Sequence, residues 1–358
     1  MQPDPTQTAI PLSQIPRSMH FALFVTGLLW LLAAHTAASH AAQTIADRLK
    51  LPLLLSPLDE ACFVILLLTG FATLSWIATR VGGIRYTNAL PQRPTAKREW
   101  LLGAALGWAA LLATVFPMVL AGQLHPQFWL ASRAWELALI SLLTLALGTL
   151  ALEVAFRGYI YQRLIDAVGP VLATVLLSVL YALFLSLRPN SSSFSVLITF
   201  LTGILFSMAY LRTHALWLGW GLHFAWDAAM GVLLGLPVAG LATYTSLVDT
   251  TTGSPLWLTG GLYGPEGALS TAVVLIAAMV VLHRSTRDYA WQYTHAPIVS
   301  AGFPMEVAPP KAHTDMEQAA AAKPAPLVQI LATTSTTSST LPIIDEHLRS
   351  NSTPDPTD

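Results

Sequence analysis

The sequence predicts an all-α membrane protein, a polytopic bundle of about eight transmembrane helices. Of its 358 residues, 54% are hydrophobic and only 10% are charged, against about 25% charged residues in a typical soluble domain. Apolar segments of about 17 to 25 residues, long enough to cross a hydrocarbon core of about 30 Å, recur along the chain. These segments are far longer than the roughly ten-residue alternating strands of a membrane barrel, so helices are expected.

The apolar segments follow one another from end to end of the first 283 residues. They are expected near 19–37, 60–79, 100–121, 136–157, 170–187, 194–211, 215–235 and 267–283. The first segment follows eighteen mostly polar residues, is long and lacks a convincing cleavage site, so it is expected to be an anchor and not a signal peptide. The fourth and the seventh differ from the others because they carry ionisable side chains within the apolar run.

Composition divides the chain into four parts. Residues 1–18 are mostly polar, residues 19–130 hold the first transmembrane helices, residues 131–296 form a membrane core, and residues 297–358 are rich in Ala, Pro, Thr and Ser. The first and last parts cannot bury enough apolar surface to offset their chain entropy, so both are expected to be disordered.

Basic residues predict the orientation in the membrane. The densest basic cluster lies between the second and third segments, and the positive-inside rule places it in the cytoplasm. The cluster consists of Arg80, Arg85, Arg93, Lys97 and Arg98. Both termini are then cytoplasmic and the connector 236–266, which has no Lys or Arg, lies outside, although Arg48 and Lys50 in another outer connector oppose this scheme. We expect an integral protein of the cell (inner) membrane, in contact with the lipid bilayer. No Lys/Arg tract indicates a nucleic acid partner.

Two pairs of ionisable residues stand in the apolar segments. Glu153 and Arg157 are four residues apart, and so are His223 and Asp227. Residues i and i+4 share a helix face. A charge at membrane depth costs at least a few kcal/mol, so it normally faces the protein interior with a partner. We expect both pairs to face one cavity, and we expect that cavity to open toward the cytoplasm.

The residues around these pairs resemble the motifs of a known family. The stretch LEVAFRGYIYQRL is similar to the first motif, Glu-Glu-x-x-x-Arg followed by Gly, of the CPBP family of intramembrane endopeptidases, the CAAX protease and bacteriocin-processing (Abi) family. The stretch LWLGWGLHFAWDAAMG resembles the last motif of that family, His-x-x-x-Asn. The resemblance covers about residues 135–283. It implies a CAAX-type hydrolase that uses water to cleave a membrane-associated or lipidated peptide, with Glu153, Arg157, His223 and Asp227 as candidate catalytic residues.

The chain departs from the family pattern where water would be activated. Leu152 stands at the first Glu, Leu185 at the His of the middle motif, and Asp227 at the Asn. A base must take a proton from water, and donors must stabilise the oxyanion. Glu153 can take over as base, although Arg157 beside it makes it a weaker one. Adjacent helical residues point about 100° apart, so Glu153 is not expected to face the direction of Leu152.

Other interpretations stay open. The two pairs can be structural contacts that lock helix packing, and the chain can be an inactive relative, a pseudoenzyme, that binds a peptide or a partner membrane protein. Zinc is the weaker cofactor alternative, because the core offers only Glu153, His223 and Asp227 as ligands and lacks His-Glu-x-x-His. No cofactor is therefore expected. A transporter is also conceivable from the buried charges, but no inverted repeat supports it.

Overall fold

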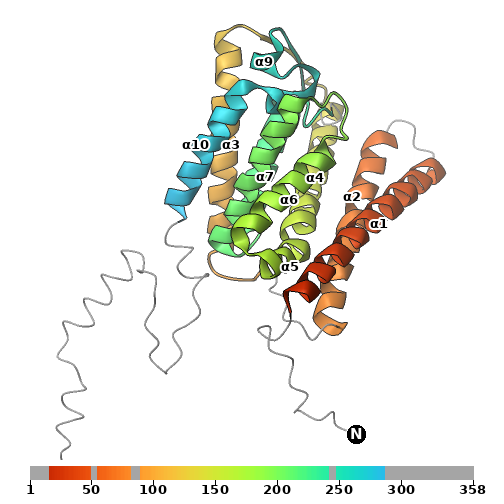
Figure 1. The fold of residues 1–358 in the computed structure, drawn as a ribbon. Coiled ribbons are helices and arrows are strands. Elements are labelled where there is room, and N and C mark those ends of the chain that lie inside the picture. The colour runs from red at the N-terminus through yellow and green to blue at the C-terminus, as the bar shows by residue number, and fades with distance from the viewer. Residues whose placement is uncertain (1–15, 50–54, 82–88, 242–246, 287–358) are drawn as a thin grey trace, which may run out of the picture. The chain divides into compact units, whose positions relative to one another are not determined.

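The structure is a computed structural model that describes residues 16–49, 55–81, 89–241 and 247–286 (Figure 1). The expected tail 297–358 and nearly all of the expected N-terminal segment 1–18 lie outside the described residues. The domain boundary expected at residue 130 stays a prediction.

Helices dominate the described residues, so the all-α fold class is confirmed. The α-helices are α1 (Arg17–Leu49), α2 (Leu55–Val81), α3 (Ala96–Leu120), α4 (Ser132–Arg157), α5 (Tyr159–Val168), α6 (Pro170–Leu185), α7 (Ser193–Thr213), α8 (Trp217–Ala228), α9 (Leu256–Thr259) and α10 (Leu269–Ser285). The other elements are the π-turn η2 (Ala229–Leu233), the 3₁₀ turns η3 (Gly261–Tyr263) and η4 (Pro265–Gly267), and the strands β1 (Leu124–Phe128) and β2 (Val248–Thr252).

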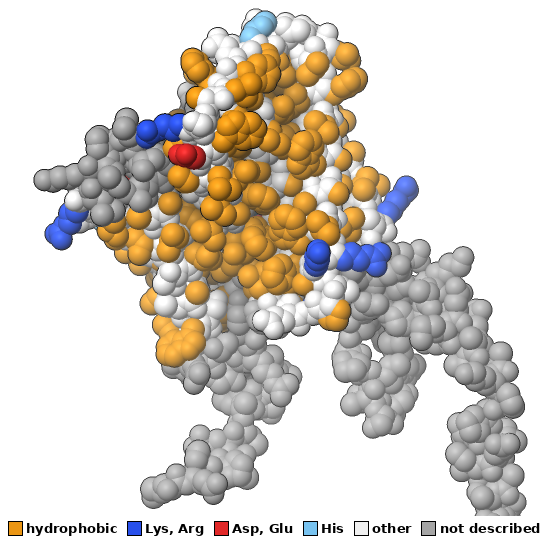
Figure 2. All heavy atoms as spheres, turned by 180° about the vertical axis from the view of Figure 1, so that it is seen from behind, with side chains coloured by type: hydrophobic (Ala, Val, Ile, Leu, Met, Phe, Trp, Pro, Cys, Tyr) orange, Lys and Arg blue, Asp and Glu red, His pale blue; other side chains and the backbone are white. Residues whose placement is uncertain are grey.

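The helices agree with the expected membrane spans. Five stretches of the described chain are long and apolar enough to cross a membrane, within α1, α2, α3, α7 and the run from α4 to α5. Helices α6 and α10 are apolar but shorter, and α8 continues into η2. Figure 2 shows one face of the molecule on which hydrophobic side chains cover the helices, while charged side chains lie near its edges. The chain is an integral membrane protein whose apolar outer surface suits lipid.

Helix α5 does not correspond to any of the expected spans. The sequence predicts a connector between residues 157 and 170, whereas Tyr159–Val168 forms a separate short helix. Gly158 makes the junction possible, because a side chain at this position would collide with the carbonyl oxygen of Val154. Ile160 and Leu164 of α5 are buried in the core beside α1 and α6. Ten residues are too few to span lipid, so apolar segments of membrane-spanning length do not indicate this helix.

Helices α3 and α8 approach each other most closely through glycines. A side-chain carbon at Gly103 would overlap the carbonyl oxygen of Leu218, and one at Gly107 would overlap that of Leu222. Gly221 on α8 meets the backbone of Trp100 in the same way. Small residues let membrane helices pack backbone to backbone. This contact fixes the helix that carries His223 and Asp227.

The connectors at one end of the bundle are tied together by a small sheet that the sequence did not predict. Strands β1 and β2 pair antiparallel, with Leu124 opposite Thr252 and Phe128 opposite Val248. At the opposite end, the guanidinium of Arg93 donates to the carbonyl oxygen of Thr213 at 3.1 Å and forms an ion pair with the buried Glu99. Arg93, Lys97 and Arg98, the residues of the basic cluster whose side chains the structure describes, therefore lie at the end of α3 opposite to the β1–β2 sheet.

Candidate active site

The two ionisable pairs meet at the contact between α4 and α8. His223 Nδ1 lies 2.9 Å from Glu153 Oε1, a hydrogen bond between residues 70 positions apart. Asp227 Oδ2 lies 3.6 Å from the other ring nitrogen of His223, Nε2. All three side chains are buried. Gly219 makes room for this contact, since a side-chain carbon there would lie 3.2 Å from Glu153 Oε2.

Arg157 lies one turn further along α4 and forms an ion pair with Glu153. Its Nη1 lies 3.6 Å from Glu153 Oε1, and its Nη2 donates weakly to the carbonyl oxygen of Gly203 at 3.4 Å. The guanidinium carbon also lies 4.5 Å from the centre of the Tyr181 ring and 5.2 Å from that of Phe206. Arg157 is fully buried, so its charge is balanced mainly by Glu153 and by the aromatic faces.

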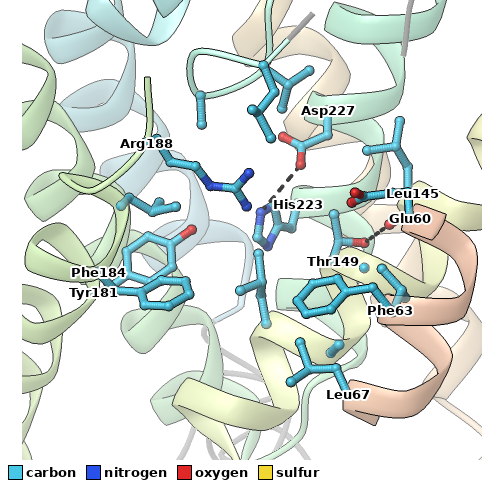
Figure 3. A pocket seen from close by; sticks show the side chains of 18 of the residues that line it. Glu60, Phe63, Leu67, Leu145, Thr149, Tyr181, Phe184, Arg188, His223 and Asp227 are labelled. Atoms are coloured by element: carbon cyan, nitrogen blue, oxygen red, sulfur yellow. Dashed lines mark hydrogen bonds and ion pairs between the residues drawn. The ribbon is translucent and has the colours of Figure 1, made fainter. Parts of the chain in front are cut away.

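A cavity adjoins this cluster on the side of His223 and Asp227 (Figure 3). Its volume is about 90 Å³, enough for a few water molecules. Apolar walls come from α2, α4 and α6: Phe63, Val64, Leu67, Leu145, Leu152, Phe184 and Leu185. Polar side chains enter from several elements: His35, Glu60, Thr149, Tyr181, Arg188, His223, Asp227 and Glu266. The cavity thus combines an apolar lining with converging ionisable groups, and its volume suits water molecules at these groups.

A second hollow, which we call the outer hollow, adjoins the cavity. It has a volume of about 330 Å³. Its walls are His35, Ser39, Ala42, Asp59, Glu60, Phe63, Phe184, Leu187 and Arg188. Five of these residues, namely His35, Glu60, Phe63, Phe184 and Arg188, also line the cavity. The outer hollow is therefore the approach to the cavity between the α1–α2 hairpin and the end of α6.

The cavity does not open where the sequence predicts. Its lining includes Val238, Ala239, Leu241 and Glu266 from the connector at the end of the bundle that carries the β1–β2 sheet. Arg157, near the other end, does not line it. The cavity therefore lies toward the end opposite Arg93, and not toward the basic end where the sequence predicts it. Which side of the membrane this end faces stays a prediction. The physical reason is that α4 presents its turns from Leu145 to Leu152 to the cavity, not its last turn.

Residues 134–229 match the model of a family described as "Type II CAAX prenyl endopeptidase Rce1-like". The match supports membership of the CPBP family for this part of the chain. The match runs from the first turn of α4 to the end of α8 and supports a CAAX-type intramembrane endopeptidase as the general class of function. No curated protein and no solved structure matches the chain.

The neighbouring residues Leu152 and Glu153 of the first CPBP motif point in different directions from α4, as adjacent helical residues do. Leu152 and Leu185, at the family's first Glu and middle His, both line the cavity, whereas Glu153 does not. Glu153 instead lies behind His223 and reaches the cavity only through that ring. The structure thus brings Glu153, Arg157, His223 and Asp227 into one cluster, with His223 and Asp227 at the cavity surface. Their catalytic roles stay predictions.

Several ionisable residues of the cavity were missed by the sequence analysis. His35 and Glu60 lie on α1 and α2, outside the part that matches the CPBP family, and Glu266 lies in the connector before α10. The criterion that singled out Glu153, an ionisable group in an apolar run, applies equally to His35 and Glu60. Arg188 and Glu266 are connector residues with no comparable local signal.

Glu266 is a connector residue that lines the cavity. Burial raises its pKa to about 7, the nearby Asp227 carboxylate raises it too, and the hydrogen bond from the Ala239 N–H opposes both effects. That N–H donates to Glu266 Oε2 at 2.7 Å. Glu266 can therefore hold or release a proton near neutral pH.

A metal site has little support from the arrangement of donors. Among the residues that the structure describes, no group of three His, Cys, Asp or Glu side chains is placed to hold a metal ion. Glu153 is separated from the cavity by His223, so the three core residues do not converge on one point from its side. The expectation that no cofactor is needed stays a prediction.

Proposed function

We propose that the chain is an intramembrane peptidase that receives a membrane-associated peptide through the outer hollow and hydrolyses it slowly at the cavity, where His223 activates water. The observation that supports this is the 2.9 Å contact between His223 Nδ1 and Glu153. A ring that donates its Nδ1–H to a carboxylate has Nε2 as the acceptor, and this atom faces Asp227 and the cavity.

The proposed reaction follows from that tautomer. His223 Nε2 takes a proton from water as the water oxygen attacks the peptide carbonyl carbon, and Glu153 stabilises the resulting imidazolium. The same proton then passes to the amide nitrogen as the C–N bond breaks. The hydroxyl of Tyr181, which lines the cavity, is a candidate donor to the oxyanion. Asp227 would repel the oxyanion if ionised, which fits slow turnover.

The test is cleavage of prenylated and unmodified peptides by the purified protein in detergent, with products identified by mass spectrometry. His223→Ala should reduce cleavage by about 10²- to 10⁴-fold, the usual contribution of a positioned base. His125→Ala, a change of an exposed histidine in β1, should leave the rate unchanged. Equal rates for wild type and His223→Ala would contradict the proposed role.

A second candidate function is non-catalytic binding of a peptide or a partner membrane protein. It is favoured by Leu152 and Leu185, because the two cavity positions that activate water in the family are apolar in this chain. The same peptides separate the two functions: a pseudoenzyme binds them but leaves them intact.

Restoring the missing groups tests how close the cavity is to an efficient peptidase. The double variant Leu152→Glu/Leu185→His should raise cleavage by about 10²- to 10⁴-fold over wild type. Either single change should help little, since it leaves one unpaired polar group in an apolar setting at a cost of a few kcal/mol. A folded double variant that binds peptide without cleaving it would favour the non-catalytic function.

A further inference from the structure

Glu266 is a carboxyl beside His223 and Asp227 that the proposed chemistry does not use. It lies in η4 and lines the cavity together with these two residues. The same three residues also line a second, smaller space that reaches α7 and α10, which we call the inner pocket. The other walls of the inner pocket are Tyr181, Thr202, Leu205, Phe206, Leu222, Trp226 and Leu275.

The connector before α10 is shaped to bring Glu266 to this position. Gly264 has a φ of +95°, which favours glycine, and a side-chain carbon there would overlap the carbonyl oxygen of Pro237. The Ala239 N–H donates to Glu266 Oε2 at 2.7 Å, and the side chain of Trp226 forms a further hydrogen bond with this carboxyl. Glu266 is therefore held against the turn of α8 that carries the candidate site.

The inner pocket has the size and the polar lining of a site for one water molecule. Its volume is about 20 Å³, whereas a water needs at least about 10–15 Å³ and two to four polar partners. The carboxyls of Asp227 and Glu266, the hydroxyl of Tyr181 and the ring of His223 supply such partners. Because both carboxyls line this pocket, one water can bridge them.

Two neighbouring carboxyls in a buried site do not both ionise, since each negative charge opposes the other. Burial raises the pKa of Glu266 to about 7, and the charge of Asp227 acts in the same direction. The pair therefore holds about one proton near neutral pH. The other titratable or charged groups around Glu266 are His223 on α8, Tyr181 on α6, Tyr263 on η3, Arg188 after α6, and His35 and Glu60 on α1 and α2.

We propose that Glu266 and Asp227 share one proton through a water bound in the inner pocket, and that this proton makes Asp227 a hydrogen-bond donor at the cavity. Glu266 gives its proton to the water while the water gives one of its own to Asp227, so the pair keeps a single negative charge. A protonated Asp227 can donate to an oxyanion that an ionised one would repel. The sharing is independent of peptide cleavage, whereas this use of the proton rests on the function proposed above.

Infrared difference spectroscopy of the full-length protein in detergent, from pH 4 to pH 9, tests the shared proton. Wild type should lose the C=O stretch of a protonated carboxyl as the pH rises through the pKa of Glu266, about 7. Asp227→Asn removes the charge beside Glu266, so the loss should occur at least about one pH unit lower. Glu266→Gln should also move the loss to lower pH, because Asp227 then lacks a second carboxyl. A water O–H band in the wild-type spectra should shift in heavy-oxygen water.

Asp249→Asn is the matched control, because Asp249 is an exposed carboxyl of β2 at the same end of the bundle. It should leave the titration at the pH of wild type. A wild type without the carboxyl band, or a titration that Asp227→Asn leaves in place, would overturn the shared proton. A water band that does not respond to heavy oxygen would overturn the bridge by water. Asp227→Asn keeps the side-chain shape and provides the comparison if thermal unfolding shows that Glu266→Gln is not folded.

The pH dependence of peptide cleavage tests the use of the proton. The rate of wild type should fall about tenfold per pH unit above the pKa of the shared proton. Asp227→Asn should not show this fall, because its amide donates at every pH. A fall that persists in Asp227→Asn would overturn the role of the proton in cleavage. A wild type that titrates as expected but cleaves no peptide at any pH would overturn the function proposed above and leave the shared proton in place.

Discussion

Glu153 on α4 and His223 on α8 share a 2.9 Å hydrogen bond that is buried beneath the cavity. The contact does two things at once. It fixes the ring of His223 in an orientation that turns Nε2 toward Asp227 and the cavity, and it gives the buried Arg157 its counter-charge. One carboxylate therefore links the stability of the helix pair to the chemistry of the cavity.

We predict that Glu153→Gln destabilises the protein by about 3 kcal/mol, because it leaves the buried guanidinium of Arg157 without its anion. The free energy of unfolding in detergent measures this loss. Glu136→Gln, which changes an exposed carboxylate on the same helix, should shift stability by less than about 0.5 kcal/mol.

The outcome also separates two roles of Glu153. If Glu153→Gln folds but loses as much cleavage activity as His223→Ala, Glu153 acts through the imidazole ring of His223. An unfolding free energy equal to that of wild type would contradict the buried ion pair.

The glycine contact between α3 and α8 predicts a second loss of stability. Gly103→Ala places a side-chain carbon against the backbone of Leu218, which cannot rotate away. Overpacking of this kind typically costs about 1–3 kcal/mol. We expect a corresponding fall in the unfolding free energy and in peptide binding, because α8 carries His223 and Asp227.

Gly148→Ala is the control for this prediction. The added carbon would meet only Val64 Cγ2, at 3.6 Å, and alanine favours a helix over glycine by up to about 1 kcal/mol. Its unfolding free energy should match or exceed that of wild type. Equal effects of the two substitutions would show that the close approach of α3 and α8 is not rigid.

The carboxyl of Glu266 predicts a pH dependence of stability. Its pKa is raised by burial from 4.5 to about 7, so the folded state holds this proton more tightly than the unfolded state does. Between about pH 4.5 and pH 7 the unfolded carboxyl loses its proton first, and the free energy of unfolding should fall as pH rises through this range. The total fall is on the order of 3 kcal/mol.

Unfolding of wild type and Glu266→Gln from pH 4 to pH 8 measures this contribution. The glutamine variant cannot ionise, so the decrease assigned to Glu266 should be absent from its profile. Parallel profiles for the two proteins would show that Glu266 is not responsible.

The general architecture could be predicted from the sequence because it depends on local properties. Apolar runs of membrane-spanning length located the long helices, and the spacing of His223 and Asp227 placed both on one face of α8. The short helix α5 was missed because its ten residues are held by burial against α1 and α6, which is a tertiary effect. The β1–β2 sheet likewise depends on the pairing of connectors that are distant in the chain.

The candidate site could be predicted only in part for the same reason. The motif residues Glu153 and His223 were found, and their direct contact follows from how α4 and α8 pack. The walls supplied by His35 and Glu60 require the α1–α2 hairpin to lie beside α4 and α5, and no pattern within either helix specifies that neighbour. Arg188 enters the cavity from the end of α6, so only the three-dimensional arrangement reveals it.

The last prediction concerns which side of the membrane the cavity faces. The positive-inside rule places the basic cluster in the cytoplasm, and the cavity lies toward the opposite end, so the outer hollow should be reached from outside. In a background with Cys62 replaced by Ala, Gln92→Cys and Thr251→Cys introduce exposed thiols at the two ends of the bundle. A membrane-impermeant thiol reagent added to intact cells should label Thr251→Cys and leave Gln92→Cys unlabelled until the membrane is opened. Labelling of Gln92→Cys alone in intact cells would reverse the orientation and turn the cavity toward the cytoplasm.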